Sequence, residues 1–328
     1  MTNPRVMLIG AGTMGAHHAR VTASSPRVEL AVVVDPDERV GRGLAEQYGA
    51  SWAPEATFTG IDAVIVAAVT DAHAHVASAV LDARLPMLLE KPVATDIAIT
   101  RDIVAASQRA GTPLMCGFVE RFNPAVITAR ALLKDPVYLT AQRHSPYARR
   151  MRTGVAWDLL IHDVDLAIQI LGSEPTSVQS VLGEFSSQSA PGEEDVADAI
   201  LGFGSGAVAT VSAARIGQRK VRTMVIHEED RLVELDLLRR SIAIHWSVSE
   251  QLVDGGRGYR QQSIIEIPDL ATSQEPLAAQ LDRFIDLIDG RADLDQERDG
   301  LLVPHEVIER VRKGYVSTLL PVRHERPA

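Results

Sequence analysis

The chain has 328 residues, of which 46% are hydrophobic, and its 33 Lys and Arg against 43 Asp and Glu give a net charge of -10. This length accommodates two domains with separate cores, and the composition is that of a globular protein rather than a disordered one. The negative charge repels phosphate backbones, which excludes nucleic acid as a general partner.

A single cysteine, Cys116, cannot form an internal disulfide and is too little for a cysteine-based metal site. It lies in the apolar run Pro113–Val119, where we expect a small buried core residue. The N-terminus shows no charged leader before a long apolar stretch, and no run of about 18 apolar residues occurs. These features predict a soluble, cytoplasmic protein without a membrane segment.

The first third of the chain alternates short apolar runs with helical patterns. The runs are Val6–Ile9, Val28–Val34, Ala63–Ala68, Met87–Leu89 and Leu114–Val119, and the helical stretches between them are 13–24, 37–48, 73–84 and 95–110. Such alternation predicts βαβ units around a parallel sheet that is buried on both faces.

The pattern changes after Asn123-Pro124. Helices are predicted at 125–134, 157–171, 274–289 and 304–318, strands at 176–185, 196–203, 207–215, 221–227, 231–236 and 241–247, and an exposed loop at 186–195. Consecutive strands joined by tight turns indicate a largely antiparallel sheet. The sequence therefore predicts a second domain of a different α/β class.

The segment Gly10-Ala11-Gly12-Thr13-Met14-Gly15 follows the first predicted strand and opens the first predicted helix. In such a G-x-G-x-x-G pattern the glycines permit a tight turn, a close approach of the pyrophosphate and close helix–strand packing. Asp35 ends the second apolar run 20 residues after Gly15, where an acid hydrogen-bonds the adenine ribose. A glycine-rich turn without a ligand is the alternative. The context favours a dinucleotide: Asp35 indicates NAD, and nearby Arg39 leaves NADP possible.

Glu90-Lys91-Pro92 follows the run Met87–Leu89. Ligands of open α/β sheets bind beyond the carboxyl ends of the strands, so Lys91 is expected to point toward the nicotinamide. A partly desolvated lysine can bind or protonate the oxygen of a hydroxyl or carbonyl group. From this motif alone, a solvated lysine is at least as good an interpretation.

The predicted helix 157–171 carries a polar stripe on an otherwise apolar surface. Asp158, His162, Asp165 and Gln169 fall within a narrow arc of it. A mostly buried helix with one polar stripe often lines a polar cleft, and a carboxylate four residues before an imidazole can orient it as a catalytic base. The spacing also allows the alternative that the stripe is a solvated face. No second His or Cys lies nearby, so no metal site is predicted.

Other histidines have local explanations. His17 and His18 of the first helix are interpreted as packing or surface residues, and His17 could approach the pyrophosphate. His73 lies near the start of a helix that Thr70-Asp71 is expected to cap.

Arg143, Arg149, Arg150 and Arg152 form a basic island in the acidic chain. Arginine suits bidentate contacts with a phosphate or diphosphate. An exposed loop with scattered charge is the alternative.

Together these motifs resemble the Gfo/Idh/MocA oxidoreductases, named for glucose–fructose oxidoreductase and inositol dehydrogenase. The resemblance extends over nearly the whole chain and rests on Gly10–Gly15, Asp35-Pro36-Asp37, Thr70-Asp71-Ala72-His73, Glu90-Lys91-Pro92, Arg121-Phe122-Asn123-Pro124 and Gly154-x-x-x-Asp158-x-x-x-His162-Asp163. It implies a doubly wound parallel Rossmann domain over residues 1–122. It also implies a substrate-binding α/β domain over 123–328, with an open, mostly antiparallel sheet that builds homodimers or homotetramers.

The resemblance further implies roles for individual residues. Lys91 is expected to bind or protonate the substrate oxygen, His162 to act as acid and base, and Asp158 to assist. The Lys-Pro bond of this motif is often cis in the family. The implied cofactor-binding residues are Gly10, Gly12, Thr13, Met14, Gly15, Asp35, Thr70, His73 and Glu90, and the implied substrate-binding residues are Lys91, Arg121, Asn123, Arg143, Arg149, Trp157, Asp158 and His162.

Within the family, residues 117–126 and 154–163 are similar to nucleotide-sugar 3-dehydrogenases. This implies hydride transfer between NAD and C3 of a nucleotide-activated hexose such as UDP-N-acetylglucosamine. Trp157 stands where that branch often has a smaller residue, and we expect it to reshape the substrate pocket. The alternatives are an inositol or free-sugar dehydrogenase, a 3-ketoreductase, and a non-catalytic NAD-binding regulator.

Overall fold

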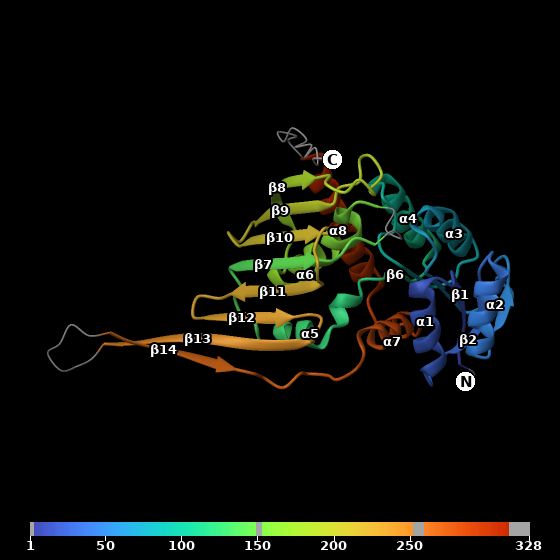
Figure 1. Ribbon diagram of the computed structural model, residues 1–328. Helices are drawn as coiled ribbons and strands as arrows, with labels where there is room; N and C mark the ends of the chain where they lie inside the picture. The colour runs from blue at the N-terminus through green and yellow to red at the C-terminus, as the bar shows by residue number, and fades with distance from the viewer. Residues whose placement is uncertain (1–2, 149–152, 252–258, 315–328) are drawn as a thin grey trace. The chain divides into compact units, whose positions relative to one another are not determined.

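The structure is a computed structural model that describes residues 3–148, 153–251 and 259–314. The chain divides into two compact units, each assembled from separate segments (Figure 1). The first contains the described residues up to Leu133 together with Leu235–Ile244 and Ile265–Glu306, and the second contains Lys134–Glu234, His245–Ile264 and the described residues from Val307 onward. The domain boundary between residues 122 and 123 stays a prediction.

The first unit contains a parallel sheet of six strands in the order β3-β2-β1-β4-β5-β6. The order reverses between β1 and β4, as in doubly wound folds that bind a ligand at this point. The predicted Rossmann fold is therefore confirmed. Its strands are β1 (Arg5–Ile9), β2 (Glu29–Val34), β3 (Ser51–Ala53), β4 (Ala63–Val66), β5 (Met87–Leu89) and β6 (Leu114–Cys116), and its connecting helices are α1 (Thr13–Ser24), α2 (Glu38–Gln47), α3 (Thr70–Asp82) and α4 (Ile97–Ala110).

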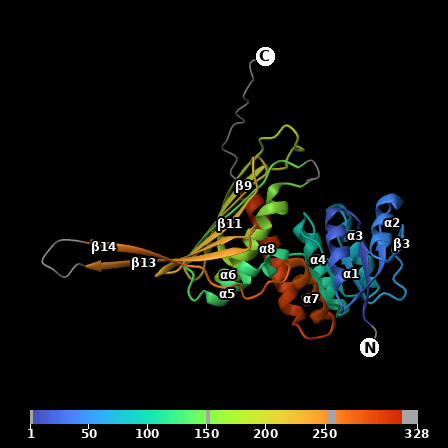
Figure 2. The same ribbon diagram turned by 60° about the horizontal axis from the view of Figure 1, so that its bottom comes forward.

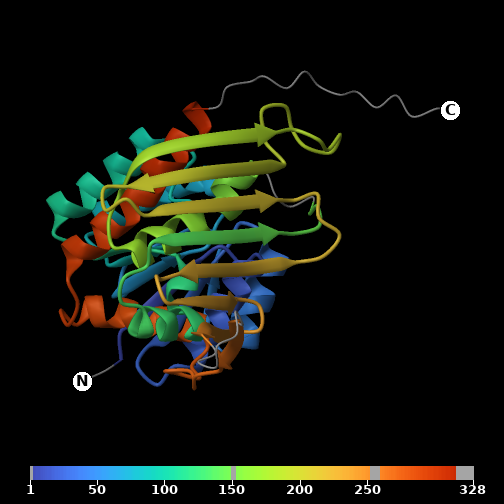
Figure 3. The ribbon, with the colours of Figure 1, turned by 90° about the vertical axis from the view of Figure 1, so that its left-hand side faces the viewer.

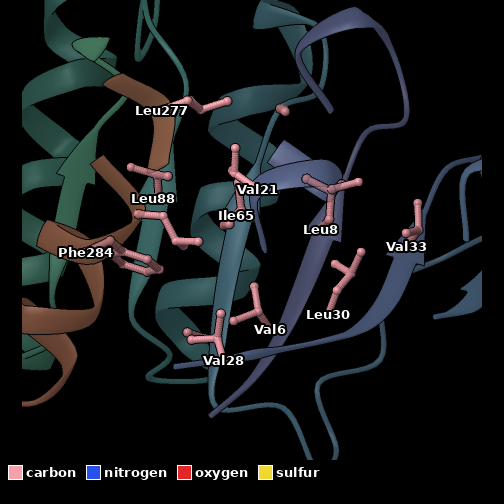
Figure 4. Close-up of a cluster of buried hydrophobic side chains, with 14 of the residues drawn as sticks. Val6, Leu8, Val21, Val28, Leu30, Val33, Ile65, Leu88, Leu277 and Phe284 are labelled. Carbon is pink, nitrogen blue, oxygen red and sulfur yellow. The ribbon is translucent and has the colours of Figure 1, made fainter. Parts of the chain in front are cut away.

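The apolar runs of the sequence become the central strands because both faces of this sheet are buried. Leu8, Val33 and Ile65 belong to one core cluster, which also contains residues of α7 (Pro276–Ile288). Figure 4 shows Leu277 and Phe284 of α7 beside Leu88 of β5. A helix from late in the chain thus completes the core of the N-terminal fold.

The second sheet has eight strands in the order β14-β13-β12-β11-β7-β10-β9-β8. β7 pairs antiparallel with β11 but parallel with β10, so the sheet is mixed and mostly antiparallel, as predicted. The strands are β7 (Tyr138–His144), β8 (Pro175–Gly183), β9 (Val196–Phe203), β10 (Val208–Ala214), β11 (Val221–His227), β12 (Arg231–Asp236), β13 (Ser241–Gln251) and β14 (Tyr259–Glu266). The sequence analysis did not predict β7 and β14 of this sheet, nor β3 of the first sheet.

One face of this sheet carries a helix, α6 (Ile161–Leu171), which contacts β7 and β10 (Figure 2). Along β9, Ala197, Ala199 and Leu201 are buried, whereas Asp198 and Ile200 between them are exposed. This period of two is expected of a strand with one covered face. Figure 3 shows the other face, which no described element of this unit covers over β8, β9 and β10. Oligomerisation through this sheet stays a prediction.

Four further elements complete the described chain. They are the 3-10 helix η1 (Val119–Phe122), the π-helical turn η2 (Ala156–Leu160) and the helices α5 (Pro124–Leu132) and α8 (Leu294–Lys313). α8 begins at Leu294 rather than at the predicted residue 304, and Pro304 lies inside it. Across the described part of the chain, none of the helices combines the length and apolar character needed to span a bilayer.

Replacing the buried Gln280 of α7 with an apolar residue should stabilise the protein. Its side chain is 0% exposed, and neither amide atom has a hydrogen-bond partner among the described residues. Burying such a group is costly, so Gln280→Met is expected to raise the free energy of unfolding by about 1–3 kcal/mol in urea denaturation. The exposed Gln108 provides the control Gln108→Met, whose effect should stay within about 0.5 kcal/mol. Equal or lower stability of Gln280→Met would contradict this interpretation.

Candidate functional site

The glycine turn after β1 is fixed by close backbone contacts. Gly10 has a φ of 98°, and a Cβ atom there would lie 2.6 Å from the Ala67 carbonyl oxygen. A Cβ atom at Gly15 would lie 1.9 Å from the Gly10 carbonyl oxygen. Both positions therefore require glycine, because the turn packs against the end of β4 and against the first turn of α1.

Gly12 has a different surrounding. No atom lies within 4 Å of the position that its Cβ would take, and no side chain caps α1 at this residue. The unpaired N–H groups of a helix start bind phosphate, and the space at Gly12 allows a pyrophosphate to approach them. Thr13 and Met14 of the same turn are exposed. The helix start formed by Gly12, Thr13 and Met14 can therefore accommodate the pyrophosphate of a dinucleotide.

Asp35 follows β2 and lies beside the glycine turn. Its Oδ2 accepts a hydrogen bond from the Ala11 amide at 2.8 Å, and its Oδ1 accepts one from the Asp37 amide at 2.9 Å. The half-buried carboxylate is thereby fixed at the carboxyl end of a strand next to the switch point. In doubly wound folds the adenine ribose binds there, so the position of Asp35 also fits NAD.

The turn after β5 presents Lys91, which is half-buried. The Lys91-Pro92 bond is cis, as is common in the family whose motif this segment resembles. The neighbouring Glu90 is buried, and its Oε1 accepts a hydrogen bond from His18 Nε2 at 2.7 Å. Glu90 was predicted to contact the cofactor, and this bond gives its carboxylate a structural use inside the first unit.

Two more histidines contact the same turn. His73 Nδ1 lies 3.0 Å from the Pro92 carbonyl oxygen and His73 Nε2 lies 3.1 Å from the Ala68 carbonyl oxygen. Burial lowers the pKa of His73, so the neutral ring carries one N–H and donates to one carbonyl at a time. His305 Nε2 accepts a hydrogen bond from the Val93 amide at 3.0 Å. Thr70, another predicted cofactor residue, is half-buried and is the first residue of α3.

In the second unit, Asp158 lies in η2 (Ala156–Leu160), a π-helical turn that leads into α6. The sequence predicted a regular helix here. Asp158 is half-buried, and His162 and Asp165 are 8% and 1% exposed. These values contradict the alternative that the polar stripe is a solvated face. π-turns inside α-helices are frequent at functional sites.

Glu194 stabilises the start of this π-turn. Its Oε1 accepts a hydrogen bond from the Ala156 amide at 2.9 Å, and its backbone carbonyl accepts one from the Val155 amide at 3.0 Å. A Cβ atom at Gly154 would lie 2.2 Å from the Glu194 carboxylate. The predicted exposed loop 186–195 is therefore wrong at its end, where Glu194 and Asp195 are buried. The alternation of polar and apolar residues from the end of this loop into β9 is the sequence signal that could have suggested this burial.

Arg143 does not lie in an exposed basic island. It is 2% exposed on β7, and its Nε and Nη2 donate to the two carboxylate oxygens of Asp163 at 3.0 and 2.8 Å. This buried pair ties α6 to the sheet and favours a structural role for Arg143 over the phosphate contact predicted from the sequence. The predicted residues Arg149, Arg150 and Arg152 lie outside the described residues.

The remaining predicted substrate residues have structural contacts. Asn123 is 2% exposed, caps α5 through Oδ1 and donates from Nδ2 to the Leu237 carbonyl oxygen. Arg121 Nη2 donates to the Gly300 carbonyl oxygen, and Trp157 is 1% exposed. Substrate contacts by these three side chains stay predictions. No cluster of three or more His, Cys, Asp or Glu suited to a metal ion occurs among the residues that the structure describes.

Alanine substitutions at Gly12 and at Gly15 should affect different properties, dinucleotide affinity in the first case and stability in the second. Gly12→Ala should leave thermal stability unchanged, because its Cβ meets no atom within 4 Å. It should weaken dinucleotide binding by about tenfold or more, because the methyl group occupies the space for the pyrophosphate. Gly15→Ala should destabilise the fold through its clash with Gly10.

Isothermal titration with NAD and thermal unfolding measure the two effects separately. Unchanged NAD affinity of Gly12→Ala, at parental stability, would remove the assigned place of the pyrophosphate.

Comparisons with known proteins identify the family of the chain. A family model for an oxidoreductase family with an NAD-binding Rossmann fold matches residues 4–118, and the model of the Gfo/Idh/MocA C-terminal domain matches residues 126–233. The UDP-N-acetylglucosamine 3-dehydrogenase of Acidithiobacillus ferrooxidans is 30% identical over 292 residues, which cover 88% of this chain and 90% of that protein. The scyllo-inositol 2-dehydrogenase (NAD(+)) of Bacillus subtilis is 25% identical over an alignment of 332 positions, which covers 92% of this chain and 96% of that protein.

A solved structure of the Acidithiobacillus enzyme superposes with a TM-score of 0.82 at 27% identity, covering 96% of this chain and 98% of that one. The first family model spans all strands of the parallel sheet, and the second spans β7 to β11 and the start of β12 in the other sheet. The resemblance inferred from the motifs is thus confirmed. The chain belongs to the Gfo/Idh/MocA family and is an NAD-dependent oxidoreductase.

Proposed function

We propose that this oxidoreductase converts the C3 hydroxyl of a nucleotide-activated hexose, such as UDP-N-acetylglucosamine, to a ketone. The observation that carries the proposal is the 30% identity to a UDP-N-acetylglucosamine 3-dehydrogenase over 88% of the chain. NAD, when bound, supplies the hydride acceptor at C4 of its nicotinamide. The chain itself must orient the sugar and move the hydroxyl proton.

Lys91 is proposed to contact the reacting oxygen. It follows β5 at the carboxyl edge of the parallel sheet, where doubly wound folds bind their ligands. Loss of the hydroxyl proton leaves negative charge on the oxygen, and a fixed ammonium group stabilises that charge. The cis peptide and the hydrogen bonds to Glu90 and Val93 define the backbone from which this lysine projects.

His162 is proposed to accept the hydroxyl proton, with Asp158 assisting substrate binding. A ring that is 8% exposed has few contacts with bulk water, so its proton exchanges mainly with groups beside it. The Arg143–Asp163 pair and the Glu194 contacts fix the segment that carries both side chains. The proton-accepting group is therefore preorganised, which lowers the reorganisation needed during reaction.

Oxidation of an inositol is the second candidate. It is favoured by the full-length similarity to a scyllo-inositol 2-dehydrogenase. The buried Arg143–Asp163 pair also supports it, because one of the arginines predicted to bind a diphosphate is engaged in the interior. An inositol needs no diphosphate site.

Removing either proposed catalytic group should slow turnover strongly without abolishing cofactor binding. Lys91→Met and His162→Gln are each expected to lower kcat/KM by about 10²–10⁴-fold. The NAD dissociation constant should stay near the parental value, because neither side chain lies on the glycine turn. The exposed Lys220 provides the control Lys220→Met, which should keep parental kinetics. Parental turnover in either active-site variant would exclude the assigned role.

A substrate panel separates the two candidates. NADH formation would be followed with UDP-N-acetylglucosamine, UDP-glucose, N-acetylglucosamine 1-phosphate, myo-inositol and scyllo-inositol. We expect kcat/KM for the preferred UDP-hexose to exceed that for either inositol by at least about tenfold, or 1.4 kcal/mol. A preference for an inositol would favour the second candidate. NAD binding without turnover of any substrate would favour a regulator.

A further inference from the structure

Three buried histidines from three helices contact the four-residue turn that contains Lys91. His18 of α1 bonds to Glu90, His73 of α3 lies at the Pro92 carbonyl oxygen, and His305 of α8 accepts from the Val93 amide. The three contacts reach residues before and after Lys91. His305 lies outside every motif that carries the family resemblance, so its role follows from the geometry.

One arrangement of protons on the His305 ring satisfies its hydrogen bonds to the Leu301 carbonyl and the Val93 amide. Its Nδ1 lies 2.8 Å from the Leu301 carbonyl oxygen, which can only accept. Its Nε2 lies 3.0 Å from the Val93 amide, which can only donate. The ring must therefore carry its proton on Nδ1 and present the Nε2 lone pair to Val93.

The surroundings keep this tautomer neutral. The ring is 0% exposed and contacts the Phe118 ring, with centroids 5.8 Å apart. Burial lowers the pKa of His305 to about 4, a bond to the Leu301 carbonyl opposes the shift, and the Arg121 cation adds to it. At neutral pH the Nε2 lone pair is therefore available to Val93.

The Val93 amide depends on this acceptor. Val93 is 0% exposed, and a buried backbone N–H without a partner is strongly disfavoured. If His305 could not accept, the amide would have to turn toward another acceptor. Val93 is two residues from Lys91, so such a movement would displace the lysine.

We propose that His305 is a positioning residue for Lys91. Through the Val93 amide, its Nε2 lone pair sets where the cis Lys91-Pro92 turn places the lysine ammonium. The proposal rests on the catalytic role assigned to Lys91 under the proposed function. It differs from a purely structural role, because it couples the His305 ring to the reactivity of Lys91 through the backbone of the turn.

Two substitutions test the lone pair. His305→Leu removes the acceptor, whereas Gln in His305→Gln carries an oxygen near the place of Nε2 and can accept from Val93. We expect His305→Leu to lower kcat by about tenfold or more at unchanged NAD affinity, and His305→Gln to recover most of that loss. Leu287→Ala, which opens a cavity in the α7 core cluster, is the stability control and should leave kcat unchanged at temperatures where it is folded.

Two measurements on the folded protein need no substrate. Amide exchange at Val93 should accelerate in His305→Leu and stay slow in His305→Gln. The rate at which an amine-directed reagent labels Lys91 should be followed against pH. We expect this rate to differ from the parental rate in His305→Leu and to stay near it in His305→Gln. If the parent oxidises no sugar or inositol, the proposed function fails, while these two readouts still decide the positioning role.

The ring tautomer of the unsubstituted protein provides a test that does not depend on any variant folding. Nitrogen chemical shifts of His305 should show the proton on Nδ1 at neutral pH. A proton on Nε2 would overturn the proposal. A lowered melting temperature in His305→Leu, with kcat and Lys91 labelling unchanged, would also overturn it.

Discussion

The segment from Glu90 to Val93 is constrained by the need to satisfy polar groups in a water-excluded interior. Glu90 and Val93 are buried, so the carboxylate of one and the amide of the other must find partners within the unit. Imidazole rings supply them, one as a donor from α1 and one as an acceptor from α8. The turn is thus stabilised by contacts of the residues on either side of Lys91.

In the second unit, buried ion pairs stabilise the segment that contains Asp158 and His162. Arg143 joins Asp163 on α6, and Arg215 joins Asp195 at 2.7 Å, with both members of the second pair fully buried. Buried pairs are costly to desolvate, and breaking one by removing a partner is strongly destabilising. Their value here is geometric. They fix α6 against β7 and fix the loop whose Glu194 contacts the π-turn, so the segment with Asp158 and His162 has a defined position.

The sequence was informative wherever burial produces a simple pattern. The strands β1, β4 and β5 are buried on both faces and read as continuous apolar runs, and the glycine pattern follows from clashes that any Cβ would cause at Gly10 and Gly15. β7 was missed because its inward residue Arg143 is charged, and its burial depends on Asp163, which is 20 residues away. The π-turn was missed because the helical prediction assumes a fixed rotation per residue about the helix axis. Such an assumption cannot reveal a local change in the number of residues per turn.

The positioning role proposed for His305 could also not be predicted from local sequence motifs. The predicted helix 304–318 began at Pro304, a residue type that is common in the first turn of helices. The helix instead begins at Leu294 and places His305 on the same buried face as Leu301 and Ile308. A histidine at an apolar position of a helix was the available signal. Its partner, Val93, lies 212 residues earlier, a distance over which local periodicity carries no information.

We propose that hydride leaves C3 of a nucleotide-activated hexose and reaches the nicotinamide. The most direct measurement uses UDP-N-acetylglucosamine that carries deuterium at C3, with mass spectrometry of the NADH formed. We expect the deuterium to appear in the NADH and its transfer to slow kcat/KM relative to the unlabelled sugar. NADH formed without deuterium, or no NADH from this sugar while an inositol is oxidised, would contradict it.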